Sequence, residues 1–176
     1  MELNNLDKLS AELGALLQKN NMFFTSAESC TGGLLSQSIV SVPGSSGWFG
    51  CSFVTYSNKS KHKMLGVSKD LLKEYGAVSE EVVKEMVSGA LDESSADIGV
   101  AISGIAGPGG GSVERPVGTV CIAWKLKNEE PISSTFLFDG ERNEVRFKTV
   151  AEGLEGAINL IKQGFKLYCS FIQYFV

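Results

Sequence analysis

The sequence has a single histidine, His62, and this scarcity excludes several kinds of catalytic site. A metal site built from several histidines is impossible, and a serine hydrolase with imidazole as its base could use only His62. The cysteines form no CxxC or other short metal-ligand spacing; they are Cys30, Cys51, Cys121 and Cys169. We therefore expect neither a metal nor another cofactor. A hydrolase with this sequence would take its base from a residue other than histidine.

Signals for secretion, membranes and nucleic acid are also missing. No apolar run approaches the ~20 residues of a membrane span, and Met1–Lys19 lacks the basic start and apolar core of a signal peptide. The net charge of −4 leaves no basic stripe for a DNA or RNA duplex. We expect a cytoplasmic protein with free thiols, and with neither membrane nor nucleic acid among its partners.

The remaining composition is that of an ordinary globular domain, with 43% hydrophobic and 20% charged residues. Because no repeat or linker interrupts it, we expect one domain over residues 1–176, ending in an apolar tail at 167–176. Periodicity and turn signals predict helices over 6–17, 34–40, 58–64, 69–75, from Ser79 to about Leu91 and over 143–166, and strands over 22–25, 48–56, 97–103, 119–124 and 132–138. This order predicts a three-layer α/β/α fold around a mixed, mainly parallel sheet.

Two glycine-containing loops follow predicted strands. The first, AESCTGG at residues 27–33, joins a strand to a helix, where backbone N–H groups can bind an anion. Plain helix capping by Ser29 or Thr31 explains it equally well. The second, SGIAGPGGGS at residues 103–112, could hold a phosphate at the end of a central strand, or could be a flexible hairpin. It matches neither GxGxxG nor the GxxxxGK[ST] phosphate loop.

The stretch from Ala27 to Lys63 is rich in serine, tyrosine and lysine. A serine hydroxyl needs a base within hydrogen-bond reach, and a lysine can serve when burial or neighbouring cations lower its pKa. Tyr56 ends a predicted strand and Lys61 lies one turn into the next helix, so both could point to the same side. A half-buried tyrosine and a solvated surface lysine remain the plainer interpretations.

A set of motifs connects these segments to a known family. They are AESCTGG (27–33), PGSSGWF (43–49), FVTYSNKSK (53–61), LGV (65–67), GAVSEEVV (76–83), SGIAGPGGGS (103–112) and PVGTV (116–120). With them the sequence closely resembles, over about residues 9–161, the C-terminal domain of the competence/damage-inducible CinA family, whose stand-alone members are nicotinamide mononucleotide deamidases. The resemblance implies an α/β/α domain that converts this small mononucleotide to nicotinate mononucleotide and ammonia by a metal-free Ser-Lys mechanism.

The resemblance also implies roles for single residues. Ser46 is expected to be the nucleophile with Lys61 as its base, while Tyr56 assists and Ser29 orients the substrate or completes a proton relay. Ser29 and Ser45 remain alternative nucleophiles, and N–H groups in the Gly44–Gly47 turn are expected to stabilise the oxyanion. The expected substrate-binding residues are Glu28, Thr31, Gly32, Gly33, Ser45, Gly104, Ala106, Gly107, Gly109, Gly110 and Arg142. The loop over residues 104–111 and Arg142 would hold the ribose phosphate.

Three points stay open at this stage. Lys59 and Lys63 flank Lys61, so the choice of the catalytic lysine depends on the register of the motif. The apolar tail could extend the last helix, add an edge strand or pack against a second subunit, and we expect a homo-oligomer. A catalytically silent interaction domain linked to competence or DNA damage, or a Ser-Lys amidase with another substrate, are the alternative functions.

Overall fold

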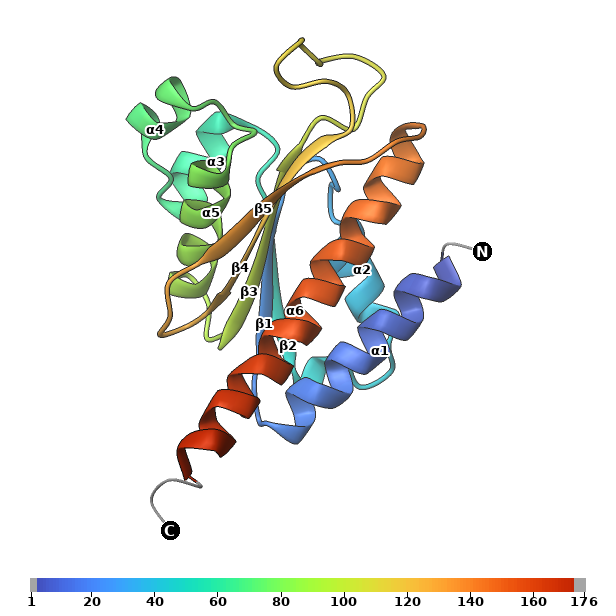
Figure 1. Cartoon of the computed structure of the whole chain (residues 1–176), viewed down its shortest axis with the longest axis vertical. Helices are drawn as coiled ribbons and strands as arrows, with labels where there is room; N and C mark the ends of the chain where they lie inside the picture. Colours follow the sequence, from blue (N-terminus) through green and yellow to red (C-terminus); the bar gives the residue numbers. More distant parts are fainter. Residues whose placement is uncertain (1–2, 173–176) are drawn as a thin grey trace.

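The computed structural model describes residues 3–172, and the side chains of residues 5–163. Its elements are α1 (Leu3–Lys19), β1 (Phe24–Glu28), α2 (Leu34–Val40), η1 (Ser45–Gly47), β2 (Phe49–Val54), α3 (Asn58–Leu65), α4 (Lys69–Glu74), α5 (Glu80–Asp92), β3 (Ile98–Gly104), β4 (Thr119–Leu126), β5 (Ile132–Leu137) and α6 (Arg142–Ile172). One sheet in the order β2-β1-β3-β4-β5 separates two helical layers. Helices α3, α4 and α5 cover one face, and α1, α2 and α6 cover the other (Figure 1).

The predicted α/β class and mixed sheet are confirmed. Strand β1 pairs in parallel with β2 and with β3, whereas β3–β4 and β4–β5 are antiparallel. The expected predominance of parallel strands therefore holds only for the β2-β1-β3 half of the sheet. The reason is that β3, β4 and β5 follow one another without a helix between them, whereas parallel neighbours are joined by a crossover connection that usually contains a helix.

The core has two parts because the sheet is buried on both faces. Along β3, Val100 and Ile102 belong to the cluster shared with α1, α2 and α6, while Ala101 belongs to the cluster shared with α3, α4 and α5. This alternation follows from the two-residue period of a strand. The same alternation determines which face of the sheet each polar residue after a strand points to, and therefore which helices it can contact.

Strand β1 runs from Phe24 to Glu28, so it begins and ends later in the chain than the strand predicted over residues 22–25. Ser26 and Glu28 are both fully buried within the strand. Polar side chains are buried only when they find hydrogen-bond partners, and here both lie within reach of Ser36 on α2. The strand therefore ends at Glu28, and the turn begins at Ser29.

Serine side chains cap the starts of three helices. Ser57, Ser68 and Ser79 each accept a hydrogen bond from the backbone N–H three residues later and begin α3, α4 and α5. Ser57 and Ser60 form a reciprocal capping box. Such caps contribute about 1 kcal/mol each. The start of α3, which carries Lys61, is thus fixed by local sequence.

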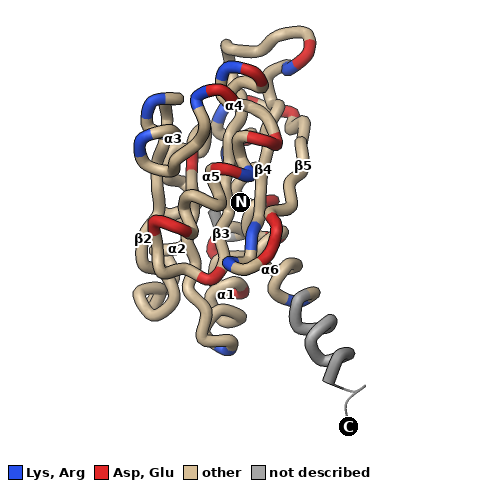
Figure 2. Tube along the Cα trace, turned by 90° about the vertical axis from the view of Figure 1, so that its left-hand side faces the viewer, with Lys and Arg blue, Asp and Glu red and all other residues tan. Residues whose placement is uncertain are grey.

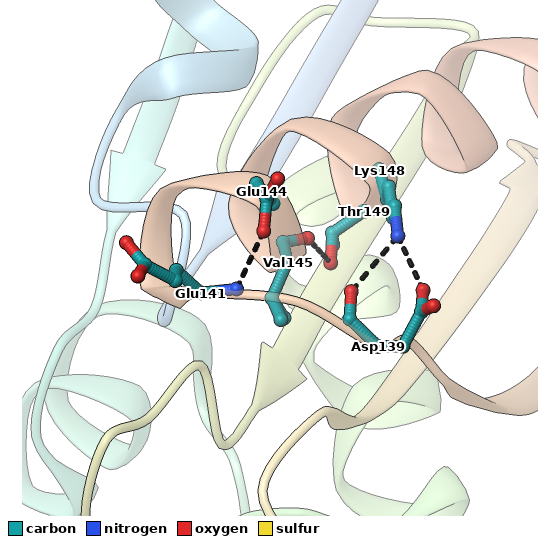
Figure 3. A network of polar contacts seen from close by, with 6 residues as sticks. All are labelled: Asp139, Glu141, Glu144, Val145, Lys148 and Thr149. Carbon is teal, nitrogen blue, oxygen red and sulfur yellow. Dashed lines mark hydrogen bonds and ion pairs between the residues drawn. The ribbon is translucent and has the colours of Figure 1, made fainter.

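Local polar contacts also fix the start of α6 (Figure 3). The N–H of Glu141 donates to the Glu144 carboxylate at 2.7 Å, and Lys148 bonds both the carboxylate and the carbonyl oxygen of Asp139. Arg142 is the first residue of α6. These contacts therefore stabilise the helix start from which Arg142 projects.

The first part of the apolar tail extends the last helix, which was one of its three predicted roles. Helix α6 continues to Ile172, beyond the predicted Lys166, while residues 173–176 and the side chains of the tail lie outside the described residues. An assembly through the tail stays a prediction. Within residues 3–172, no helix is long and apolar enough to cross a membrane. Cys30, Cys51 and Cys121 are free thiols.

Candidate active site

The carboxyl ends of β2, β1 and β3 lie side by side at one edge of the sheet. The register pairs Glu28 with the residues directly before Thr55 and Ser103. Thr55, Ser29 and Ser103 therefore form a polar row across three adjacent strands. Ligands of open α/β sheets bind outside this edge.

Lys61 reaches this row from α3. Its side chain is 1% exposed, and its Nζ donates to Ser29 Oγ at 2.9 Å and to the carbonyl oxygen of Thr55 at 2.8 Å. Lys59 and Lys63 are exposed, which settles the register of the motif: Lys61 is the inward lysine. His62 is exposed as well and bonds the Val67 carbonyl instead.

Burial lowers the pKa of Lys61 from 10.5 to about 8, although the neighbouring Cys30 acts in the opposite direction. Removal of water disfavours the charged ammonium, and the described side chains provide no carboxylate partner within ion-pair distance of Nζ. A neutral amine is thus accessible near physiological pH. A lysine with such a pKa can accept the proton of a hydroxyl 2.9 Å away.

The thiol beside Ser29 is a poor competitor for this chemistry. Burial raises the pKa of Cys30 to about 12. Because the thiolate is the reactive form of cysteine, Cys30 stays protonated and inert at neutral pH. No group of His, Cys, Asp or Glu side chains within the described part of the chain could hold a metal ion.

Hydrogen bonds from Glu28 and from Arg146 stabilise the turn that contains Ser29. One oxygen of the Glu28 carboxylate accepts the N–H groups of Gly33 and Leu35, and the other accepts the N–H and hydroxyl of Ser36. Gly32 and Gly33 have φ values of +61° and +94°, which favour glycine. Glu28 was expected to contact the substrate, but its carboxylate is occupied by α2.

Arg146 supports the same turn from α6. Its guanidinium donates to the carbonyl oxygen of Thr31 at 2.7 Å and to the side chain of Asn143 at 3.2 Å. A contact between positions 115 residues apart in sequence cannot be recognised from a local motif.

Buried hydroxyls without a partner gather around Ser29. The described side chains include four such atoms, and three of them, on Thr31, Thr55 and Ser103, follow or end β1, β2 and β3; the fourth is on Ser10 of α1. An unsatisfied buried hydroxyl costs about 1–3 kcal/mol. A cluster of them at one strand edge is typical of a site whose polar partner is a ligand or water.

Arg142 joins two other predicted site residues. Its guanidinium donates to the Gly107 carbonyl at 2.7 Å and to the Tyr56 hydroxyl at 3.0 Å. The Tyr56 side chain is 62% exposed, and Arg142 is exposed too. The predicted association of the glycine loop with Arg142 is therefore present in the geometry. Tyr56, which was expected to assist Lys61, bonds Arg142 instead.

The first part of the glycine loop after β3 packs against the rest of the protein, and the second part is exposed to solvent. Gly104 lies against β4, where an added Cβ would come within 2.7 Å of Val120, and Ala106 is buried. Gly107 is buried with φ +85°, while Gly109 and Gly110 are exposed. Only the first part of the loop, up to Gly107, is thus tied to the rest of the site through Arg142.

The expected pairing of Ser46 with Lys61 is wrong. Ser45 and Ser46 lie in η1, directly before β2, whereas Thr55 and Lys61 follow that strand. Because β2 is parallel to β1, its start lies at the opposite edge of the sheet from Ser29. Strand β2 has six residues and spans roughly 20 Å. The exposed Ser46 and the expected oxyanion turn at Gly44–Gly47 are therefore remote from the lysine.

Sequence reasoning missed Thr55, Ser103 and Arg146. Ser103 carried a usable signal, since it ends the strand predicted over residues 97–103, whereas Thr55 lay inside the strand predicted over residues 48–56. The observed parallel pairing aligns both with Ser29. Arg146 carried none, because nothing in the local pattern of α6 separates it from a solvated surface residue.

The comparisons with known proteins agree with one another. The family model of the CinA C-terminal domain matches residues 6–161. "Nicotinamide-nucleotide amidohydrolase PncC" of Enterobacter agglomerans is 47% identical over 90% of this chain and 96% of its own length, and the protein of that name from Escherichia coli K12 is 47% identical over 86% and 92%. The crystal structure of the competence/damage inducible protein CihA from Agrobacterium tumefaciens superposes with a TM-score of 0.86, at 39% identity, over 89% of this chain and 95% of that one.

Proposed function

The chain belongs to the CinA C-terminal domain family, and on this premise we propose that it is an amidohydrolase that converts nicotinamide mononucleotide to nicotinate mononucleotide and ammonia. The names of its relatives support the substrate. The observation that carries the chemistry is the contact of a buried lysine with a serine, Lys61 Nζ to Ser29 Oγ at 2.9 Å. It favours Ser29, rather than Ser46, as the nucleophile.

The proposed reaction needs only this pair and water. Neutral Lys61 accepts the proton of Ser29 as the Ser29 oxygen attacks the carboxamide carbon. Lys61 then gives that proton to the departing amine, which leaves as ammonia, and an ester remains on Ser29. Water, deprotonated by the same lysine, attacks the ester. Lys61 then returns this proton to the Ser29 oxygen as the carboxylic acid is released. One amide and one water are consumed for each acid and ammonia formed.

The backbone after Ser29 is suited to stabilise the oxyanion. The N–H groups of Cys30 and Thr31 follow the nucleophile directly, in a turn that Glu28 and Arg146 hold rigid. Preorganised donors of this kind are worth about 3–4 kcal/mol each in the transition state. This assignment replaces the Gly44–Gly47 turn, which lies at the other edge of the sheet.

Arg142 is the proposed anchor for the substrate phosphate. Among the side chains of residues 5–163, it is the one cation that contacts both Tyr56 and Gly107, and a guanidinium can bind a phosphate through two parallel hydrogen bonds. Tyr56 then orients the guanidinium and contacts the substrate, while the unpartnered hydroxyls of Thr31 and Ser103 face a polar part of it.

The test is ammonia release from nicotinamide mononucleotide by the purified protein, with nicotinamide riboside as the substrate that lacks the phosphate. We expect release from the mononucleotide and much slower release from the riboside. Acid quenching during turnover and mass spectrometry should find the nicotinoyl ester on the peptide that contains Ser29. An inert protein would support the silent interaction domain instead, and an ester on the peptide with Ser46 would overturn the assignment of the nucleophile.

A further inference from the structure

A second concentration of positive charge lies on the outer side of the helix that carries Lys61. Lys59 and Lys63 of α3 and Lys69 and Lys73 of α4 line one cavity of about 510 Å³. All four are exposed, whereas Lys61 points inward to Ser29. In the tube view, the basic residues of α3 stand at one margin of the molecule (Figure 2). The cavity is therefore separate from the catalytic edge, although α3 contributes to both.

These lysines have no acidic partners among the described side chains. Elsewhere on the surface, Lys148 pairs with Asp139 and Lys162 with Glu12, but no carboxylate lies within 4.0 Å of the four lysines of the cavity. The contrast is notable because the chain is acidic overall, with a net charge of −4. Like charges around one cavity repel one another, and a multivalent anion bound between them would remove that repulsion.

The rest of the lining suits a small molecule. Leu72 supplies an apolar wall and is 8% exposed, and the lysine stems add further apolar surface. The His62 ring also lines the cavity, with Nδ1 2.9 Å from the Val67 carbonyl oxygen. Because a carbonyl only accepts, Nδ1 carries the hydrogen of this bond. The volume falls within the range of about 300–1,000 Å³ usual for small-molecule sites.

We propose that the cavity between α3 and α4 is a second ligand site, for a small molecule that carries two or more phosphate groups. Four ammonium groups match the charge of a diphosphate or triphosphate better than that of a single phosphate. The bound phosphates would contact lysines of both helices and hold α3 against α4. Inorganic polyphosphates and nucleoside polyphosphates share this chemistry, and they differ in whether a base also contacts the wall at Leu72.

Calorimetric titration tests the proposal with inorganic pyrophosphate and ATP as the two probes. We expect both to bind the wild-type protein, and ATP to bind more tightly if its base packs on Leu72. The double variant Lys69→Gln/Lys73→Gln should bind pyrophosphate at least about tenfold more weakly. The matched control, Lys8→Gln/Lys127→Gln, removes the same charge from exposed positions elsewhere and should stay within about twofold of wild type.

Nuclear magnetic resonance of isotope-labelled wild-type protein locates the probe without any variant. Pyrophosphate should shift the amide resonances of residues 58–73. Shifts confined to Ser29, Gly107 and Arg142 would mean that the probe occupies the catalytic edge, and would overturn the proposal. Absence of binding at millimolar probe, or equal weakening in the control variant, would overturn it as well. None of these measurements depends on amidase activity, so the two proposals fail independently.

Discussion

Two turns of this molecule each place serine among glycines at the border of a strand, and only one of them meets a lysine. Residues 29–33 follow β1, and residues 44–47 precede β2. Ser29 is half-buried and bonds the buried Lys61, whereas Ser46 is exposed and lies in a turn closed by backbone hydrogen bonds. The comparison teaches that a serine acquires a base through its position relative to the strand direction, not through its local motif.

The strongest test of this contrast is to remove each hydroxyl in turn. Ser29→Ala should lower kcat/KM for ammonia release by about 10⁴-fold or more, because it removes the proposed nucleophile. Ser46→Ala should leave kcat/KM within about twofold of wild type, since its hydroxyl is remote from the lysine. Steady-state ammonia assays on both variants measure the difference. The opposite ranking would disprove the choice of Ser29.

Replacing the base should have the next largest effect. Lys61→Met should reduce kcat by about 10²–10⁴-fold, the usual contribution of a general base. The matched variant Lys63→Met removes an exposed lysine from the same helix and should change kcat little. Measured kcat values for the pair separate the inward lysine from its neighbour. Equal losses in both would show that the overall charge of α3 matters rather than the contact with Ser29.

Arg142 is expected to act on binding more than on chemistry. Arg142→Gln should raise KM for nicotinamide mononucleotide by about 10–100-fold with a smaller change in kcat, because a charge-assisted contact with phosphate is lost. Arg142→Lys keeps the positive charge but lacks the forked geometry of a guanidinium. Its KM should therefore lie between those of the wild type and Arg142→Gln. With nicotinamide riboside, which has no phosphate, the variants and wild type should be alike. A riboside rate reduced as much as the mononucleotide rate would argue against phosphate binding.

The smallest effect is the pH dependence. Because the pKa of Lys61 is lowered to about 8 and the neutral amine is the active form, kcat should rise with pH through about 8 and then level off. Between pH 7 and pH 9 the increase should be about tenfold. Rates from about pH 6 to pH 10, with wild-type stability checked at each value, give the profile. A rate that falls as pH rises through 8 would indicate that Lys61 acts as a cation.

Much of the fold could be predicted because its signals are local. The serine caps of α3, α4 and α5 and the strand pair near the end of the sheet follow from residues a few positions apart. The failure at β1 also has a physical cause. Ser26 and Glu28 look like turn residues, but partners on α2 allow them to be buried in a strand.

The sequence by itself limited the type of chemistry. A single histidine and scattered cysteines argued against imidazole-rich and metal sites, and the family resemblance implied a serine, a lysine, Tyr56 and Arg142. Tertiary structure alone decided which serine meets Lys61, because parallel strands place their starts and ends at opposite edges of a sheet. It also decided that Glu28 holds α2 and that Arg142 bonds Gly107 and Tyr56. The contacts of Arg142 join positions whose closeness in space the chain order does not reveal.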